Sequence, residues 1–189
     1  ARQNIKPALF KELLDITVRT YYLFTQIFNL WNGYHLFAID GTRVHMPYSE
    51  SVETDFGFQG DGRYDRKHFM GLGSVLYDIS QDYVVDATLE YVHSSERDLA
   101  RKHISKLESL DLIENSLIIF DRGYFSTDMF NFLVDAGCSC LMRIKKSTTS
   151  LTGSEEDDIV LDSAKYHANI RVVQVELSTG EIESLVTNI

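Results

Sequence analysis

The sequence predicts an α/β protein in which a mixed β-sheet is flanked by helices. Two segments rich in β-branched and aromatic residues are joined by a hairpin-sized turn, which predicts antiparallel pairing. Further along the chain, strand–helix–strand units predict parallel pairing through right-handed crossovers. With 189 residues and a hydrophobic fraction of 44%, the chain is long and apolar enough to bury a core of this kind.

The first element is expected to be a helical segment over residues 4–32. Its apolar residues recur near a period of 3.6, and its aromatic content suggests that it docks on the rest of the fold. The next segment, 34–40, is expected to be a strand that ends on Asp40 and turns at Gly41. Residues 46–65 are polar and are interpreted as a long loop.

The hairpin strands are residues 68–79 and 83–92. A helix over 96–110 follows, and Ser95 and Asp98 at its start resemble a capping box. The later elements are a strand over 116–121, a helix that begins at Ser126 or Thr127, a strand over 138–144, and hairpin strands over 170–177 and 181–188. This order is typical of the ribonuclease-H-like fold. It divides the chain into a helical segment (1–33), a core (34–146) and an incomplete β-rich insertion (147–189).

Composition narrows the class of protein. A net charge of −10 favours solubility and is unusual for a free-standing nucleic-acid binder, although a local basic face is compatible with it. Cys138 and Cys140 are interpreted as a reduced, buried pair, because no second Cys/His pair has the spacing of a zinc site. Nothing suggests a disulfide scaffold, so a reducing cytoplasm fits. The sequence has no run of about 18 apolar residues and no signal peptide, so no membrane partner is expected. The chain begins at Ala1 and stops just after a strand-like run, as expected of an excerpt.

Two acids occupy matching positions in the predicted sheet. Asp40 and Asp121 each close a predicted strand, and a turn that contains glycine follows each of them. If the two strands are parallel neighbours, the carboxylates meet at one edge, where their oxygens suit Mg²⁺ or Mn²⁺. A pair of such ions can activate a water and stabilise the leaving oxygen of a phosphodiester. An Asx-turn at each strand end explains the same pattern, and the spacing leaves both interpretations open.

Three longer segments contain these acids or lie between them. In chain order they are FAIDGTRVHMP, HSSERDLARKHI and IIFDRGYFSTDMFNFLVDAGCSCLMRIK. Together they resemble the catalytic domain of DDE-type bacterial insertion-sequence transposases, in particular the insertion-sequence-four-like family. The resemblance runs from about Leu36 to the C-terminal hairpin, and DRGY is its most specific part.

The resemblance implies a site and a reaction. It implies that Asp40 and Asp121 are catalytic residues that bind Mg²⁺ or Mn²⁺. It also implies a third acid, a Glu in a Tyr-Arg-Glu-Lys-type segment, and none in this chain matches it, so the excerpt is expected to be inactive alone. The implied reaction is hydrolysis at transposon ends followed by strand transfer into target DNA. A homodimer on DNA in the bacterial cytoplasm is the expected assembly.

Basic and aromatic residues near these acids are candidates for DNA contact. The candidates are Arg122, Tyr124, Arg66, Lys67, Lys145 and Lys146. Contacts to phosphates would give affinity without sequence information. The alternatives are an ion pair between Arg122 and a nearby carboxylate, and a solvated face for the other basic residues. Glu96 and Arg97 fit the family pattern and fit a helix-surface ion pair equally well.

Two other functions fit the same residues. One is an inactive or decayed module that binds DNA or dimerises. The other is a two-metal nuclease of the same fold, which hydrolyses DNA without strand transfer. A product assay separates the nuclease from the transposase, since joined DNA appears only for the transposase.

Overall fold

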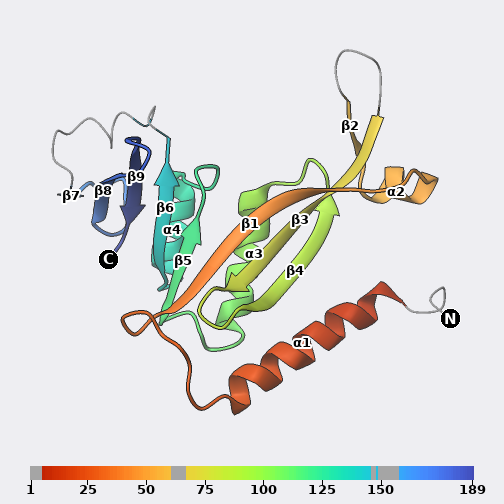
Figure 1. The fold of residues 1–189 in the computed structure, drawn as a ribbon, viewed down its shortest axis with the longest axis horizontal. Helices are drawn as coiled ribbons and strands as arrows, with labels where there is room; N and C mark the ends of the chain where they lie inside the picture. The colour runs from red at the N-terminus through yellow and green to blue at the C-terminus, as the bar shows by residue number, and fades with distance from the viewer. Residues whose placement is uncertain (1–5, 61–66, 146–147, 149–157) are drawn as a thin grey trace.

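A mixed β-sheet forms the centre of the molecule. The computed structural model describes residues 6–60, 67–145, 148 and 158–189. Within these residues nine strands form one sheet in the order β2-β3-β1-β5-β6-β9-β8-β7, and β4 pairs with β3 (Figure 1). The strands are β1 (His35–His45), β2 (Phe58–Gly60), β3 (Lys67–Asp78), β4 (Tyr83–Tyr91), β5 (Ser116–Phe120), β6 (Ser139–Ile144), β7 (Asp158–Leu161), β8 (Ile170–Glu176) and β9 (Ile182–Thr187).

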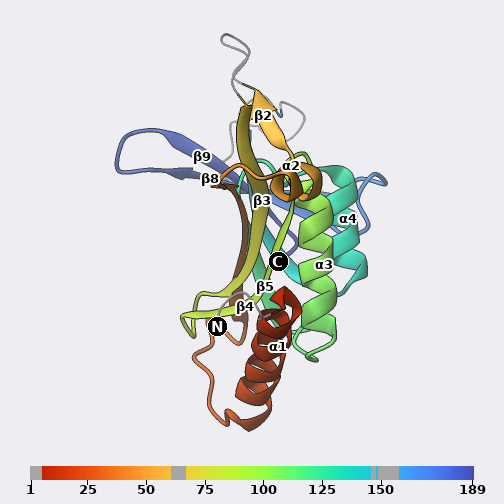
Figure 2. The same ribbon diagram turned by 90° about the vertical axis from the view of Figure 1, so that its right-hand side faces the viewer.

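The helices lie on one face and along one edge of this sheet. They are α1 (Pro7–Phe24), α2 (Glu50–Asp55), α3 (Glu96–Glu108) and α4 (Thr127–Asp135). Helices α3 and α4 cover the same face (Figure 2), and α1 lies alongside β4 (Figure 1). The predicted fold class, a ribonuclease-H-like mixed sheet flanked by helices, is confirmed.

None of the helices in the described residues combines the length and the apolarity needed to cross a membrane.

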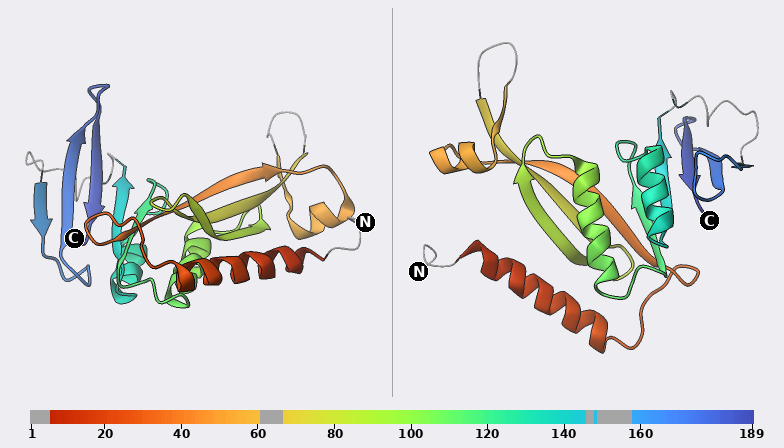
Figure 3. Two further views of the ribbon diagram at one scale, coloured as in Figure 1. Left: turned by 60° about the horizontal axis from the view of Figure 1, so that its bottom comes forward. Right: turned by 180° about the vertical axis from the view of Figure 1, so that it is seen from behind.

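The core lies between the central strands and helices α3 and α4, and the view from behind shows these two helices in front of the strands (Figure 3). Strand β5 is almost wholly buried, as expected for a strand with parallel neighbours on both sides. Its partners across the core are the apolar faces of the two helices, formed by Leu99, Ala100, Ile104, Leu107, Met129, Phe130 and Leu133. Burial of each large side chain contributes about 1.5–3 kcal/mol, which fixes both helices against the sheet.

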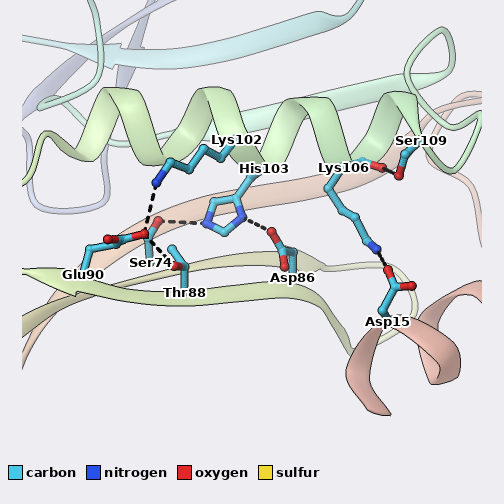
Figure 4. Close-up of polar contacts among 9 residues, drawn as sticks. All are labelled: Asp15, Ser74, Asp86, Thr88, Glu90, Lys102, His103, Lys106 and Ser109. Carbon is cyan, nitrogen blue, oxygen red and sulfur yellow. Dashed lines mark hydrogen bonds and ion pairs between the residues drawn. The ribbon is translucent and has the colours of Figure 1, made fainter. Parts of the chain in front are cut away.

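Helix α3 is also held by polar contacts to β3, β4 and α1 (Figure 4). His103 is fully buried, and its Nδ1 lies 2.8 Å from Asp86 Oδ2. Its Nε2 lies 3.0 Å from Ser74 Oγ. An imidazole that donates from Nδ1 to the carboxylate accepts at Nε2 from the serine hydroxyl, so both ring nitrogens are satisfied. Lys106 pairs with Asp15 and ties the same helix to α1.

The prediction of a long polar loop over residues 46–65 is wrong for the residues of this segment that the structure describes. Residues 50–55 form α2, and Ser49 caps it by accepting a hydrogen bond from the Val52 backbone N–H. Residues 58–60 form β2, which pairs with the start of β3. The helix is short and polar, so apolar periodicity gave no signal for it.

Strand β1 is also longer than predicted, because it continues past Asp40 and Gly41 to His45. It continues because β3 remains paired with it through His45 and Met70. At the other end, the N-terminal helix stops at Phe24, earlier than the predicted residue 32.

The C-terminal strands extend the main sheet. Strand β9 pairs antiparallel with β6, from Leu141 opposite Thr187 to Ile144 opposite Ser184. Strand β8 pairs with β9, and β7, which was not predicted, pairs with β8. The boundary between a core and a separate insertion stays a prediction. The predicted reduced cysteine pair is confirmed: Cys138 and Cys140 are free and buried, and burial raises the pKa of each thiol to about 12.

Candidate active site

The sheet places Asp40 and Asp121 side by side. Strands β1 and β5 are parallel, and their last paired residues are Ile39 and Phe120. The next residue of each chain segment is therefore one of the two aspartates, on neighbouring strands that lie about 4.8 Å apart. Asp40 is the point where β1 leaves β5 and continues along β3 alone. Both carboxylates are exposed at this step in the sheet.

The two carboxylates have different neighbours. Asp40 Oδ1 accepts a hydrogen bond from the Gly41 backbone N–H at 2.8 Å, which is the local turn-like contact expected of an aspartate. Asp121 Oδ1 accepts from Arg143 Nη1 at 2.9 Å. Arg143 lies on β6, so the arginine that neutralises Asp121 comes from the strand on the other side of β5.

Arg143 belongs to a four-membered charge network. It also donates to Glu183 on β9, at 3.1 Å from Nε and 3.0 Å from Nη2. Arg122 pairs with the same carboxylate. Glu183 is 8% exposed, and the hydrogen bond from Arg143 is the main reason that its pKa is lowered. The ion pair that sequence offered as the alternative role of Arg122 is therefore present.

Helix α3 brings a third carboxylate to the same place. Glu96 is the first residue of α3 and follows the cap residue Ser95. A Cβ atom built on Gly41 would lie 3.2 Å from Glu96 Cγ and 3.3 Å from Oε1, and one built on Gly123 would lie 3.7 Å from Oε2. The Glu96 carboxylate therefore lies against the two glycines that follow Asp40 and Asp121 in sequence.

Arg97 fixes the turn after Asp121. Its Nε donates to the Tyr124 carbonyl at 3.1 Å, and its Nη2 donates to the carbonyls of Gly123 and Phe125 at 3.0 and 3.2 Å. Arg97 thus holds the DRGY segment by its backbone. An ion pair between Glu96 and Arg97 on the helix surface was one of the two interpretations of these residues from the sequence. It is not among the contacts of the described residues. The HSSERD segment drew attention to Glu96 and Arg97 in the sequence, but it did not predict that Arg97 binds the backbone carbonyls after Asp121.

Tyr124 is buried, with 1% of its surface exposed, and its ring packs on Phe120 with centroids 5.3 Å apart. It was a candidate for DNA contact, and its burial places the ring in the core instead. The tyrosine hydroxyl has no hydrogen-bond partner. Burial raises the pKa of this hydroxyl, and the negative charges of Glu96, Asp40 and Asp121 raise it further.

The basic candidates lie at different distances from the acids. Arg122 is 44% exposed and Lys145 is exposed directly after β6, so both flank the acids. Lys67 pairs with Glu53 at 2.6 Å and lies on β3 about 26 Å from Val75, the residue opposite Asp40. Arg66 and Lys146 lie outside the described residues.

An open pocket of about 320 Å³ adjoins Glu96. Its lining residues are Arg43, Leu72, Val92, Ser94, Ser95, Glu96, Arg97 and Gly123. Arg43 is exposed on β1 and has no hydrogen-bond or ion-pair partner among the described residues. Sequence reasoning missed it, although it lies three positions after Asp40 in FAIDGTRVHMP.

Within the described part of the chain, no three Asp, Glu, His or Cys side chains are grouped closely enough to hold a metal ion. At this edge the reason is visible, because Asp121 is directed to Arg143 and Asp40 to its own turn.

The comparison with protein families identifies a transposase domain. The family model described as "Transposase DDE domain" matches residues 31–184. A piggyBac transposase in a synaptic complex with hairpin DNA has 10% sequence identity and a TM-score of 0.49. The match covers 82% of this chain, which spans 33% of the length of that transposase.

A second solved structure, endonuclease V from Ciona intestinalis in complex with inosine-containing DNA, has 10% identity and a TM-score of 0.39. That match covers 97% of this chain and 83% of the endonuclease. No curated protein matches the sequence. Because the family model covers most of the chain, the protein belongs to the transposase DDE domain family.

Proposed function

We propose that this chain is the catalytic part of an insertion-sequence-four-like DNA transposase. In this proposal it hydrolyses a phosphodiester at a transposon end and then transfers the freed strand into target DNA. The observation that carries the proposal is the register of β1 and β5, which places Asp40 beside Asp121 in a chain of the transposase DDE domain family. The whole transposase would act as a homodimer on DNA in the bacterial cytoplasm.

The residues at this edge fit a divalent cation such as Mg²⁺ or Mn²⁺. They offer hard carboxylate oxygens, a buried tyrosine hydroxyl without a partner, and a glycine at position 41 that leaves room beside Glu96. When bound, the cation would stabilise charge on the phosphodiester and activate the attacking oxygen. Asp40 and Asp121 would hold it, and Asp121 would exchange Arg143 for it.

The protein groups around the acids would position the DNA backbone. Arg43 lines the pocket beside Glu96, and Arg122 and Lys145 flank Asp121 on the β6 side. Each could contact a phosphate on one side of the reacting bond, which would fix the strand across the acids. Lys67 is too far from the acids to reach the same phosphate and would contact flanking DNA.

A plasmid assay tests this function. The purified protein is incubated with supercoiled plasmid, a labelled oligonucleotide and Mn²⁺, and nicked circles and joined products are separated on a gel. We expect both products from the whole transposase that contains this chain and neither from this chain alone, in which no Glu matches the third acid; the variants below are made in the whole transposase. Asp40→Asn should lower nicking by on the order of a thousandfold, because loss of about 4 kcal/mol of transition-state stabilisation has that effect. Asp111→Asn is the matched control, since it lies beyond the far end of α3 and Asn tolerates its positive φ of 55°.

The products distinguish the alternatives. Nicking without joined DNA would replace the transposase proposal by a nuclease. DNA binding without nicking would replace it by a non-catalytic module. Equal nicking by Asp40→Asn and the wild type would contradict the role of Asp40.

A further inference from the structure

We propose that Glu96 is a third carboxylate ligand of the divalent cation held by Asp40 and Asp121. The inference rests on the proposed function, because it assumes that the two aspartates bind a cation. It adds a ligand from the N-terminus of α3, a different element from the strands that supply the aspartates.

The position of Glu96 is the first argument. One of its carboxylate oxygens lies toward Gly41 and the other toward Gly123, so the group lies between the turns that follow the two aspartates. A Cβ at Gly41 would crowd the Glu96 side chain, since it would lie 3.2 Å from Glu96 Cγ. Gly41 has no positive φ that would require glycine, so its backbone conformation does not explain the missing side chain.

The lack of partners is the second argument. Nearby charged groups are paired: Asp121 with Arg143, Glu183 with two arginines, and Arg97 with three carbonyls. Glu96 has no hydrogen-bond or ion-pair partner among the described residues. An acid near a helix N-terminus is favourable by itself. That effect does not require the carboxylate to face the two aspartate turns.

The Tyr124 hydroxyl is the third and independent argument. It is 1% exposed and unpartnered, and the charges that act on it belong to Glu96, Asp40 and Asp121. Buried tyrosine hydroxyls usually find a hydrogen-bond partner, and an unpaired one destabilises the fold by about 1–3 kcal/mol. A carboxylate turned toward the hydroxyl when a cation joins the three acids would accept this hydrogen bond.

Charge balance is the fourth argument. Three carboxylates at one edge of the sheet repel one another, and a divalent cation removes that repulsion. Oxygen ligands of this type suit Mg²⁺ and Mn²⁺. Asp121 must leave Arg143 to join the other two acids, which is a change of one exposed ion pair.

Mn²⁺ titration followed by electron paramagnetic resonance tests the inference without any need for activity, because the sharp signal of free Mn²⁺ disappears on binding. We expect wild-type binding, and affinity lower by on the order of tenfold or more for Glu96→Gln. Glu108→Gln is the matched control: it changes an exposed Glu at the last residue of the same helix, about 18 Å away. Melting temperatures confirm that each variant is folded.

A second variant tests the geometry and leaves the charge unchanged. Gly41→Ala should weaken Mn²⁺ binding by displacing Glu96, whereas Gly73→Ala should not, because its Cβ meets its neighbours at an ordinary 3.4 Å. Loss of binding in Asp40→Asn with full binding in Glu96→Gln would overturn the role of Glu96 and leave the proposed function standing. Absence of Mn²⁺ binding by the wild type would overturn both.

Discussion

Helix α3 presents polar groups to the sheet at two places, and the two places differ in how they are satisfied. In its middle, His103 is fully buried and both ring nitrogens have partners, Asp86 and Ser74. At its first residue, Glu96 is exposed, unpaired in the described structure and close to two further acids. A polar cluster whose hydrogen-bonding groups all have partners within the protein stabilises the fold. A cluster with charged groups that have no partner can bind a ligand.

The buried cluster has the residue types of a hydrolytic triad, and burial decides against that role. Ser74 is 0% exposed, so no substrate reaches its hydroxyl. The three side chains come from α3, β3 and β4, and they bind these elements to one another (Figure 4). Chemistry-bearing residue types therefore indicate a site only where the structure leaves them accessible.

Of the effects expected from the contrast between the two sites on α3, the largest is on stability. His103→Ala should lower the free energy of unfolding by about 3 kcal/mol. It removes two hydrogen bonds, leaves a cavity, and leaves the side chains of Ser74 and Asp86 without these hydrogen-bond partners. Urea denaturation measures the change.

His167→Ala is the control for this substitution, because that side chain is 52% exposed and pairs only with exposed Asp135 in the described contacts. It should change the free energy of unfolding by less than about 0.5 kcal/mol. Equal destabilisation by the two substitutions would show that the buried His103 contacts stabilise the fold no more than the exposed His167–Asp135 contact does.

A smaller effect is expected when the cation competitor at Asp121 is removed. Arg143→Gln should raise Mn²⁺ affinity by up to about fivefold, because an exposed ion pair contributes about 0.2–1 kcal/mol that a cation must overcome. Titration of Mn²⁺ against both proteins gives the ratio. Arg171→Gln, which breaks an exposed pair with Asp158 on β7 and β8, should leave the affinity unchanged. Weaker binding in Arg143→Gln would show that the guanidinium supports the site.

The smallest effect is a change in the pH dependence of stability. The pKa of Glu183 is lowered in the folded protein, mainly by its hydrogen bond from Arg143. Its ionised form therefore stabilises the fold above the unfolded-state pKa, near 4.5, and this contribution is lost as pH falls through the lower folded-state pKa. Glu183→Gln should lower the melting temperature at pH 7 and approach the wild type in acid. A constant difference from pH 3 to 7 would contradict this assignment.

Much of the fold could be predicted from local patterns. The hairpin of β3 and β4, the start of α3 at Ser95 and the short buried strand before Asp121 each have signals within a few residues. Helix α2 and strand β7 could not be found in this way, since both are short and lack a clear apolar period. The end of β1 was misplaced for a related reason: its continuation depends on pairing with β3, which lies more than twenty residues further along the chain.

The sequence alone determined the fold class, the two aspartates and the family to which they point, because strand ends, caps and the DRGY segment are local features. Only the tertiary structure decided which groups meet those aspartates. Arg143 and Glu183 arrive from neighbouring strands, and Glu96 arrives from a helix between them in sequence. Their proximity results from strand order and helix packing, so no spacing along the chain encodes it. The same packing buries Tyr124, which the DRGY segment had suggested as a residue that contacts DNA.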